Sequence, residues 1–516
     1  MKLILSRILI AGLGIIFSSL VAEERMVVRF VDPDKTVLTE FNETDYDIAA
    51  FKPGEFLDLV VSKSQYEELL TRGFHITVTQ TEDQLRQNLG DVRDLYGYRN
   101  YDELLEDLQE IELQYPDICK LYDIGNTRGK EYSMAGNSYY NDYNHEIWAM
   151  KVSDNVAEEE DEPSVFYMAE HHAREPISLE VNMYVLNHII SNYGSDPIIT
   201  EEVNNKQIWF MPLVNPNGHK IVTDEVDLWW RKNIRDNNEN GSINFGGGDG
   251  VDPNRNYDWN WGGEGSSGDT NSETYRGPSA FSEPEIQAMR DILGSHHFVT
   301  GITYHAYSEL VLFPFGYANN IQAPDHDALQ ELANDMAFTI PGQNGGYYDP
   351  IPSWQLYPAS GTTDDYAYGE HGVFSFTIEL ATQFIPPASQ IEGICENNLE
   401  AALILLTRVN KKALTGHITD AESGDPVVAE IYIDGIDNTG EFRKPYESDL
   451  IFGRYYRLLQ MGSYDVTFSA LGYETQTINN VSISPLQQTV LDVELEPILM
   501  VPVTGRVTDG YTGAPI

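Results

Sequence analysis

Cysteine, basic residues and long apolar runs are all scarce in this sequence. The 516 residues include only two cysteines, Cys119 and Cys395, and 32 lysines and arginines stand against 81 aspartates and glutamates. So few cysteines exclude a disulfide scaffold and a metal site built on thiolates. The two thiols are expected either to form one bridge or to stay free and buried. The formal charge of -49 argues against nucleic acid or an anionic membrane surface as a partner.

The one extended apolar run lies at the N-terminus. A basic start at Lys2 and Arg7 leads into an apolar stretch that ends near Ala22, and the acidic Glu23 follows. This order is typical of a secretory signal peptide. A membrane anchor is the competing interpretation, but the run is shorter than the roughly 20 residues that a spanning helix needs. We therefore predict a signal peptide over residues 1–22, a secreted or extracytoplasmic protein, and no membrane span after signal cleavage.

The segment after the predicted signal peptide reads as a small unit of its own. At about 150 residues per domain, the length suggests three or four domains. Residues 23–90 alternate apolar strands with one helical stretch, and Ser64 with Glu67 has the spacing of a capping box, which predicts a helix start at Ser64. The order predicts a small α/β domain. It is interpreted as a prosegment that assists folding or inhibits the protein, or as a spacer.

Residues 95–411 mix amphipathic helices with short buried strands. Leucines and isoleucine recur at helical spacing from Tyr101 to Tyr115, and a last helix is predicted over 397–412. Runs rich in β-branched and aromatic residues, typical of buried strands, occur at 164–168, 207–213, 299–304 and 373–380. This alternation predicts an α/β fold with a mixed, mostly parallel central sheet flanked by helices. Active groups should then collect at strand ends and in the loops that follow.

Beyond residue 411 the pattern changes to short strands and glycine-containing turns. It predicts a β-sandwich over residues 412–497. The segment TGHITDAESGDPV at 415–427 returns as TGRVTDGYTGAPI at 504–516. A second copy of the same module is therefore expected to begin near residue 501, with only its opening strand and turn present. We expect the chain to be a piece of a longer protein.

A candidate metal site follows the predicted strand at 164–168. His172 and Glu175 lie three residues apart in the segment AEHHAREP at 169–176. In a loop at a strand end, the histidine nitrogen and the carboxylate oxygen can face one zinc ion. The pattern alone is weak, because a surface histidine beside an ion-paired glutamate looks the same.

Seven motifs in order strengthen the case, because they resemble those of the zinc carboxypeptidases, the family of the pancreatic carboxypeptidases A and B. They are HARE at 172–175, WRKN at 230–233, GVDPNRN at 250–256, YRGP at 275–278 with SEPE at 282–285, YHAYS at 304–308, YPASGTTDD at 357–365 and FTIEL at 376–380. The resemblance implies a zinc metallocarboxypeptidase that hydrolyses the C-terminal peptide bond of peptides and proteins with a zinc-activated water.

The resemblance also implies roles for individual residues. His172, Glu175 and His305 correspond to the ligands of one catalytic Zn²⁺, which leaves the fourth position to water. His171 is assigned to the surrounding structure, because the spacing to Glu175 selects His172. Glu379 corresponds to the general base that takes a proton from the zinc-bound water.

Five further positions are implied to contact the substrate. Arg231 corresponds to the residue that stabilises the oxyanion. Asn254, Arg255 and Tyr357 correspond to the group that holds the terminal carboxylate, and a bidentate guanidinium pair explains why only chain ends are cut. Asp364, seven residues after Tyr357, corresponds to the base of the specificity pocket. A carboxylate there would favour C-terminal Lys or Arg, as in carboxypeptidase B, and broad specificity is the alternative.

Two positions leave questions open. A one-residue slip would exchange the roles of Asp364 and Asp365, because the family has a structural aspartate at the second position. The pancreatic enzymes carry a charged residue two positions beyond the catalytic glutamate, whereas this chain has Ala381. Local support for Glu379 therefore differs from that in the pancreatic enzymes.

Two other functions compete with this assignment. One is a metallo-amidase that acts on cell-wall peptides, against which the acidic residue Asp364 counts. The other is a catalytically inactive binding homologue, which should have lost a metal ligand or the base, yet all four residues are present. The expected partners are peptide or protein C-termini and not nucleic acid, and the catalytic domain is expected to be monomeric.

Overall fold

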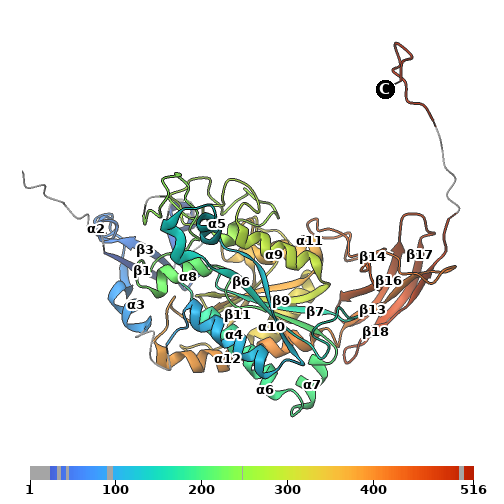
Figure 1. Cartoon of the computed structure of the whole chain (residues 1–516), viewed down its shortest axis with the longest axis horizontal. Coiled ribbons are helices and arrows are strands. Elements are labelled where there is room, and N and C mark those ends of the chain that lie inside the picture. Colours follow the sequence, from blue (N-terminus) through green and yellow to red (C-terminus); the bar gives the residue numbers. More distant parts are fainter. Residues whose placement is uncertain are drawn as a thin grey trace, which may run out of the picture.

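The computed structural model describes residues 24–31, 37–41, 46–89, 97–246, 248–498 and 505–515. The predicted signal peptide lies outside these residues. Within them, a small N-terminal unit, a central α/β body and a group of C-terminal β-sheets follow one another along the chain (Figure 1). Among the described residues, none of the helices is long and apolar enough to span a bilayer.

The central body is built on an eight-stranded mixed sheet with the order β11-β10-β12-β9-β7-β8-β6-β5. The four strands β12, β9, β7 and β8 run parallel to one another. The strands are β5 (Cys119–Asn126), β6 (Glu146–Val152), β7 (Ser164–Ala169), β8 (Gln207–Met211), β9 (Phe298–Ala306), β10 (Leu310–Phe313), β11 (Asp349–Pro352) and β12 (Phe374–Leu380). Every residue of β7, β8 and β9 is buried, as expected for parallel strands covered on both faces. The predicted mixed, mostly parallel sheet is confirmed.

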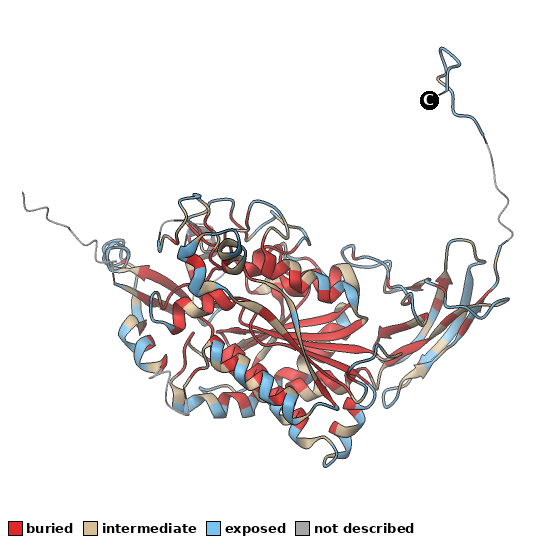
Figure 2. Cartoon of the chain, in the orientation of Figure 1, coloured by how far each residue is buried: buried red, intermediate tan, exposed pale blue. Residues whose placement is uncertain are grey.

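Helices cover both faces of this sheet (Figure 2). Alternate residues of β7 pack into different apolar clusters, Val165 and Tyr167 into one and Phe166 and Met168 into the other, as the two-residue period of a strand requires. The helices are α4 (Tyr101–Gln114), α5 (Arg128–Met134), α6 (Ile177–Asn192), α7 (Pro197–Val203), α8 (Pro216–Thr223), α9 (Pro284–Ser295), α10 (His326–Ala337), α11 (Thr363–His371) and α12 (Ala388–Arg408), with 3₁₀ turns η1 (Ser138–Tyr143), η2 (Pro253–Arg255) and η3 (Ser353–Gln355). The last helix therefore begins earlier than the predicted 397. Cys119 and Cys395 are buried free thiols.

The N-terminal unit is a four-stranded antiparallel sheet with the order β2-β3-β1-β4. Its elements are β1 (Arg25–Val31), α1 (Val37–Glu40), β2 (Asp47–Lys52), β3 (Phe56–Ser62), α2 (Lys63–Thr71), β4 (Ile76–Thr81) and α3 (Glu82–Leu89). The capping box of α2 is formed by Ser62 and Gln65, so the predicted pair of Ser64 and Glu67 is wrong. The reason is that β3 continues to Ser62, whose extended backbone suits the cap position.

The C-terminal region consists of short β-strands around an apolar cluster of its own. One sheet has the order β15-β13-β18, with β19 also on β13, and the other has the order β14-β16-β17. The strands are β13 (Ala413–Asp420), β14 (Glu430–Ile433), β15 (Arg454–Leu458), β16 (Gly462–Ser469), β17 (Gln476–Ile483), β18 (Thr489–Val490) and β19 (Val493–Leu495). The sequence repeat makes the same turn twice, because Asp420 and Asp509 each accept two backbone N–H groups from the residues that follow.

Candidate active site

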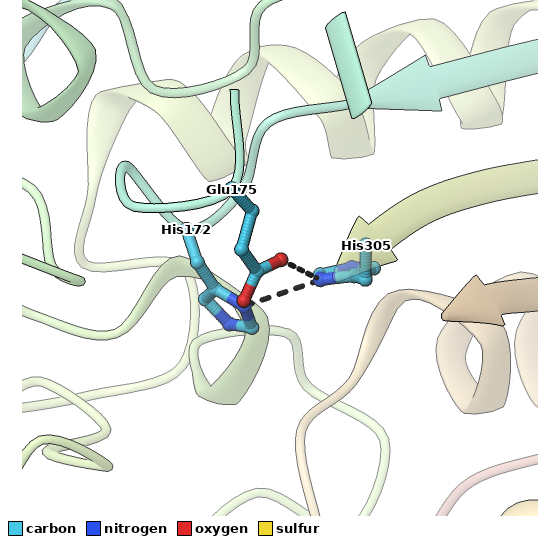
Figure 3. A group of neighbouring side chains, drawn as sticks. All are labelled: His172, Glu175 and His305. Carbon is cyan, nitrogen blue, oxygen red and sulfur yellow. Dashed lines mark hydrogen bonds and ion pairs between the residues drawn. The ribbon is translucent and has the colours of Figure 1, made fainter. Parts of the chain in front are cut away.

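Three buried side chains from distant parts of the chain meet at the carboxyl ends of β7 and β9 (Figure 3). His172 and Glu175 lie in the loop after β7, and His305 lies near the end of β9. The Nδ1 atom of His172 is 2.8 Å from Glu175 Oε1, and the Nδ1 atom of His305 is 3.0 Å from Glu175 Oε2. All three are at most 4% exposed. Parallel pairing of β7 with β9 brings their ends together.

The donor atoms of these residues fit a zinc ion. The two Nδ1 atoms are 3.1 Å apart, and each residue offers a ligand atom within 4.8 Å of the others. Imidazole nitrogens and a carboxylate oxygen are ordinary zinc ligands, and three of them leave a fourth position open. The far nitrogen of His172, Nε2, lies 3.2 Å from Asp252 Oδ1. Such a carboxylate orients the ring, and Nδ1 is the atom of His172 that would hold the metal.

Glu379 lies beside this group because of strand register. β12 pairs parallel with β9, and the pairing sets Glu379 opposite His305. The side chain of Glu379 lines the same cavity as the three ligands. Burial raises the pKa of Glu379 to about 8, His305 opposes this rise and Glu175 adds to it. A carboxyl group with a pKa near neutrality can both accept and return a proton at physiological pH.

Arg231 is joined to the metal ligands through Asp252. Its Nε and Nη2 atoms donate to Asp252 Oδ2 at 3.1 and 3.0 Å. Burial opposes the ionisation of Asp252, but Arg231 and His172 outweigh it and hold the pKa of this carboxyl well below its usual range. The sequence motifs suggested no role for Asp252, although it stands inside the motif GVDPNRN. A buried aspartate just before a proline-initiated turn was the available signal.

Asn254, Arg255 and Tyr357 line the same cavity. The Oδ1 atom of Asn254 accepts a hydrogen bond from the backbone N–H of Thr363 at 2.9 Å. The guanidinium of Arg255 donates to the backbone carbonyls of Asn254 and Gly265. Two arginines and an amide thus surround a cavity that also contains the metal ligands, an arrangement suited to an anionic group.

The neighbouring residues Asp364 and Asp365 face different surroundings. Asp364 lines the cavity, and its Oδ2 atom accepts a hydrogen bond from Ser353 Oγ at 3.0 Å. The carboxylate of Asp365 accepts the backbone N–H of Gly316 at 2.8 and 3.0 Å and is fully buried. Burial and the nearby Asp364 raise the pKa of Asp365 well above its usual range. Asp365 thus ties a loop in place, whereas Asp364 is directed at the cavity.

Comparison with known proteins agrees with this geometry. The family model described as "Zinc carboxypeptidase" matches residues 104–401, more than half of the chain. The chain belongs to the zinc carboxypeptidase family. It is 35% identical over 266 residues to carboxypeptidase A2 of Rattus norvegicus, a match that covers 50% of this chain and 60% of that protein, less than two thirds of its length.

Two further comparisons cover more of the chain. Carboxypeptidase B of Astacus astacus is 29% identical over 320 residues, which are 60% of this chain and 97% of that protein. The crystal structure of carboxypeptidase A from Helicoverpa armigera matches with a TM-score of 0.63 at 23% identity and covers 74% of this chain and 97% of that one. The structural match supports the fold of this family member.

Two residues near the site differ in role from the metal ligands. His171 is buried, and its Nε2 atom lies 2.9 Å from the hydroxyl of Tyr257 and 3.0 Å from that of Thr363. It therefore holds neighbouring loops together. Ala381 adopts a left-handed backbone with φ of 55°, and its N–H donates to the hydroxyl of Tyr348 at 2.9 Å.

The N-terminal unit lies over the site of this family member. Ala49 and Ala50 of β2 line the cavity together with the metal ligands, and its volume is about 50 Å³. Pockets that hold small molecules typically measure about 300–1,000 Å³, so an amino-acid residue does not fit. Asp47 pairs with both terminal nitrogens of Arg174 at 2.6 and 2.7 Å. The unit therefore covers the groups that surround the metal site.

Proposed function

We propose that this family member is a zinc carboxypeptidase that removes C-terminal residues from peptides and prefers lysine and arginine. The main support for this proposal is that Glu379, Arg231 and Arg255 line one cavity together with the three metal ligands. Zinc, when bound by these ligands, supplies Lewis-acid chemistry, since it polarises a carbonyl and activates water near neutral pH. Each remaining task falls to a side chain of this cavity.

The side chains divide the reaction between them. Glu379 accepts a proton from the attacking water and donates it to the leaving amine nitrogen, for which a pKa near neutrality is suited. Arg231 donates to the oxygen that becomes negative as the carbonyl carbon turns tetrahedral. Asn254 and Arg255, with Tyr357, hold the terminal carboxylate, and an internal peptide bond offers no such group. These roles support exopeptidase rather than endopeptidase action.

Asp364 carries the proposed preference for basic residues. It is 3% exposed and lines the cavity. Its Oδ2 atom accepts a hydrogen bond from the neutral hydroxyl of Ser353, which does not neutralise the negative charge that a substrate cation would match. A buried carboxylate with a free charge favours a lysine or arginine side chain, because the ion pair offsets its desolvation.

The direct test compares three substrates with the N-terminal unit removed. We expect turnover of hippuryl-Arg to exceed that of hippuryl-Phe, with no turnover of a muropeptide. A chelator should abolish activity and added Zn²⁺ should restore it. The matched variants Asp364→Asn and Asp365→Asn separate the two carboxylates: the first should lower the preference for Arg, and the second should lower stability. Turnover of the muropeptide alone would overturn the substrate class in favour of a cell-wall amidase.

We also propose that residues 23–90 form an inhibitory prosegment. Two observations support this proposal. Residues of β2 line the cavity, whose volume is about 50 Å³, and Asp47 forms an ion pair with the fully buried Arg174. Asp58, also fully buried, accepts a hydrogen bond at 2.6 Å from the hydroxyl of Tyr307, which lines the cavity. Limited proteolysis should release this unit and raise activity from near zero. Full activity of the uncleaved chain would contradict the proposal.

Residues 1–22 are proposed to direct export of the chain, by the pattern of a basic start and a short apolar core. The measurement is N-terminal sequencing of the protein recovered from the medium or the cell surface. A start at or near Glu23 is expected. Retention of Met1 on a protein found inside the cell would contradict export.

A further inference from the structure

A segment of the C-terminal region leaves its own sheets and contacts the central body. Residues 437–446, between β14 and β15, are called the bridging segment. The backbone N–H of Glu441 donates to Gln322 O and that of Lys444 donates to Gly369 O, both at 2.8 Å. Gly440 adopts φ of 66°, and a Cβ there would lie 2.6 Å from Gln322 O. The approach is therefore close enough to require glycine.

Buried charges hold the bridging segment in place. Arg443 Nε lies 3.1 Å from Asp325 Oδ2, and Arg457 Nη2 lies 3.3 Å from Asp325 Oδ1. The hydroxyl of Tyr368, on α11, donates to Asp325 Oδ2 at 2.7 Å. All four residues are at most 6% exposed. Because a buried charge that loses its partner is strongly unfavourable, this junction holds one geometry.

An aromatic path leads from the same segment toward the cavity. The ring of Phe442 stacks on Trp259, with centroids 6.3 Å apart and planes at 11°. Trp259 stacks on Phe315, with centroids 5.9 Å apart and planes at 6°. Phe315 precedes Gly316, which lines the cavity and whose N–H holds the carboxylate of Asp365.

The helix α11 links the bridging segment to the cavity. Its first turn carries Asp364 and Asp365. Farther along, Gly369 O accepts the N–H of Lys444, and the Tyr368 ring lies 6.0 Å from the Arg443 guanidinium. At 1.5 Å per residue a nine-residue helix is about 13 Å long and stiff, so a constraint at one end orients the other. In Figure 1, α11 lies on the side of the body that faces the C-terminal sheets.

We infer that the bridging segment positions α11, and through it the specificity pocket, so that the C-terminal module takes part in substrate selection. This inference rests on the proposed function. Arg443 and Phe442 act as positioning residues: Arg443 contacts Asp325 and the Tyr368 ring of α11, Phe442 contacts Trp259, and neither lines the cavity. The chemistry selected is a cationic C-terminal side chain, which must meet Asp364 at a fixed place.

The test uses the full-length chain after release of the N-terminal unit, with a matched control. Arg443→Ala removes the ion pair with Asp325 and the contact with the Tyr368 ring of α11. Arg454→Ala removes another Arg–Asp contact between the same two regions, at 2.8 and 2.9 Å from Asp161. Arg443→Ala should lower the ratio of kcat/KM for hippuryl-Arg over hippuryl-Phe about fivefold or more, mainly through KM. Arg443→Lys should recover part of it, and Arg454→Ala should leave the ratio unchanged.

A second readout does not depend on activity. Hydrogen exchange of the amides of residues 363–371 should accelerate about tenfold in Arg443→Ala and stay at the wild-type rate in Arg454→Ala. If Arg443→Ala does not fold, Phe442→Ala tests the same path, because Phe442 is 72% exposed. The inference would be overturned if these variants exchanged amides at the wild-type rate, or if Arg454→Ala lost as much of the kcat/KM ratio as Arg443→Ala. If the wild-type protein shows no preference for Arg, the proposed specificity is wrong. The exchange rates would still test whether the bridging segment positions α11.

Discussion

The N-terminal unit and the C-terminal module both dock on the central body, but by different contacts. The N-terminal unit shares an apolar cluster with Leu310, Leu312 and Leu356 near the cavity, and its ion pair with Arg174 uses an aspartate that is 16% exposed. The C-terminal module uses Asp325 and Arg457, whose side chains are 1% and 0% exposed. The first contact lies beside the cavity, which residues of β2 help to line, whereas Asp325 and Arg457 do not line it. The N-terminal contact therefore lies next to the site, whereas the C-terminal contact joins an aspartate and an arginine that are both fully buried.

Under the proposed function, the N-terminal unit blocks access to the cavity, and the catalytic residues, Glu379 among them, belong to the central body. Glu379→Gln should lower kcat about 1,000-fold even after the unit is released, because the general base is lost. Bound zinc, measured by metal analysis, should stay at one ion per chain, and Gln should preserve the fold. Turnover within tenfold of the wild type would show that another group is the base.

The buried ion pairs of the C-terminal contact predict the next largest effect, a loss of stability. Asp325→Ala removes one of the two carboxylates that Arg443 and Arg457 share and leaves them Asp437, so the free energy of unfolding should fall by about 1.5–3 kcal/mol. Thermal or denaturant unfolding measures this change. Asp161→Ala, which removes a more exposed partner of Arg454, serves as the control and should cost about 1 kcal/mol or less. Equal losses would break the distinction between the two kinds of contact.

The ion pair between Asp47 of the N-terminal unit and Arg174 predicts a gain of activity when it is weakened. Asp47→Asn takes the charge from the partner of the fully buried Arg174, which should weaken docking of the N-terminal unit by about 1.5–3 kcal/mol. The uncleaved chain should then show roughly tenfold higher basal turnover of hippuryl-Arg than the wild-type chain. Arg72→Ala, whose partners Glu40 and Glu68 both lie within the N-terminal unit, is the control. No gain in basal turnover would mean that Asp47 does not hold the unit closed.

A smaller effect concerns pH at the C-terminal contact. Burial, together with Glu160 and Asp154, raises the pKa of Glu162 to about 8, next to Asp161 at the module boundary. The group titrates near 4.5 when unfolded, so its stabilisation is present below about pH 4.5 and is lost as the pH rises through 8. Glu162→Gln should reduce this pH-dependent loss in the free energy of unfolding by about 1 kcal/mol, because solvent partly screens the group. Identical pH profiles of unfolding would contradict the assignment.

The sequence predicted the sheet and the metal ligands because both depend on local patterns. Buried parallel strands leave apolar runs, and the order of seven motifs identified His172, Glu175 and His305. Its errors arose where two local patterns compete. Ser62 with Gln65 and Ser64 with Glu67 both have the spacing of a capping box, and only the length of β3 decides between them.

The sequence by itself indicated the family, the metal ligands and Glu379, because its motifs resemble those of the zinc carboxypeptidases in the same order. The tertiary structure alone decided which residues meet across the chain. Asp47 and Arg174 are 127 positions apart, and Asp325 and Arg457 are 132 apart. No local pattern predicts such pairs, since they form only when segments far apart in the sequence come together. The covering of the cavity and the support of α11 are both products of that docking.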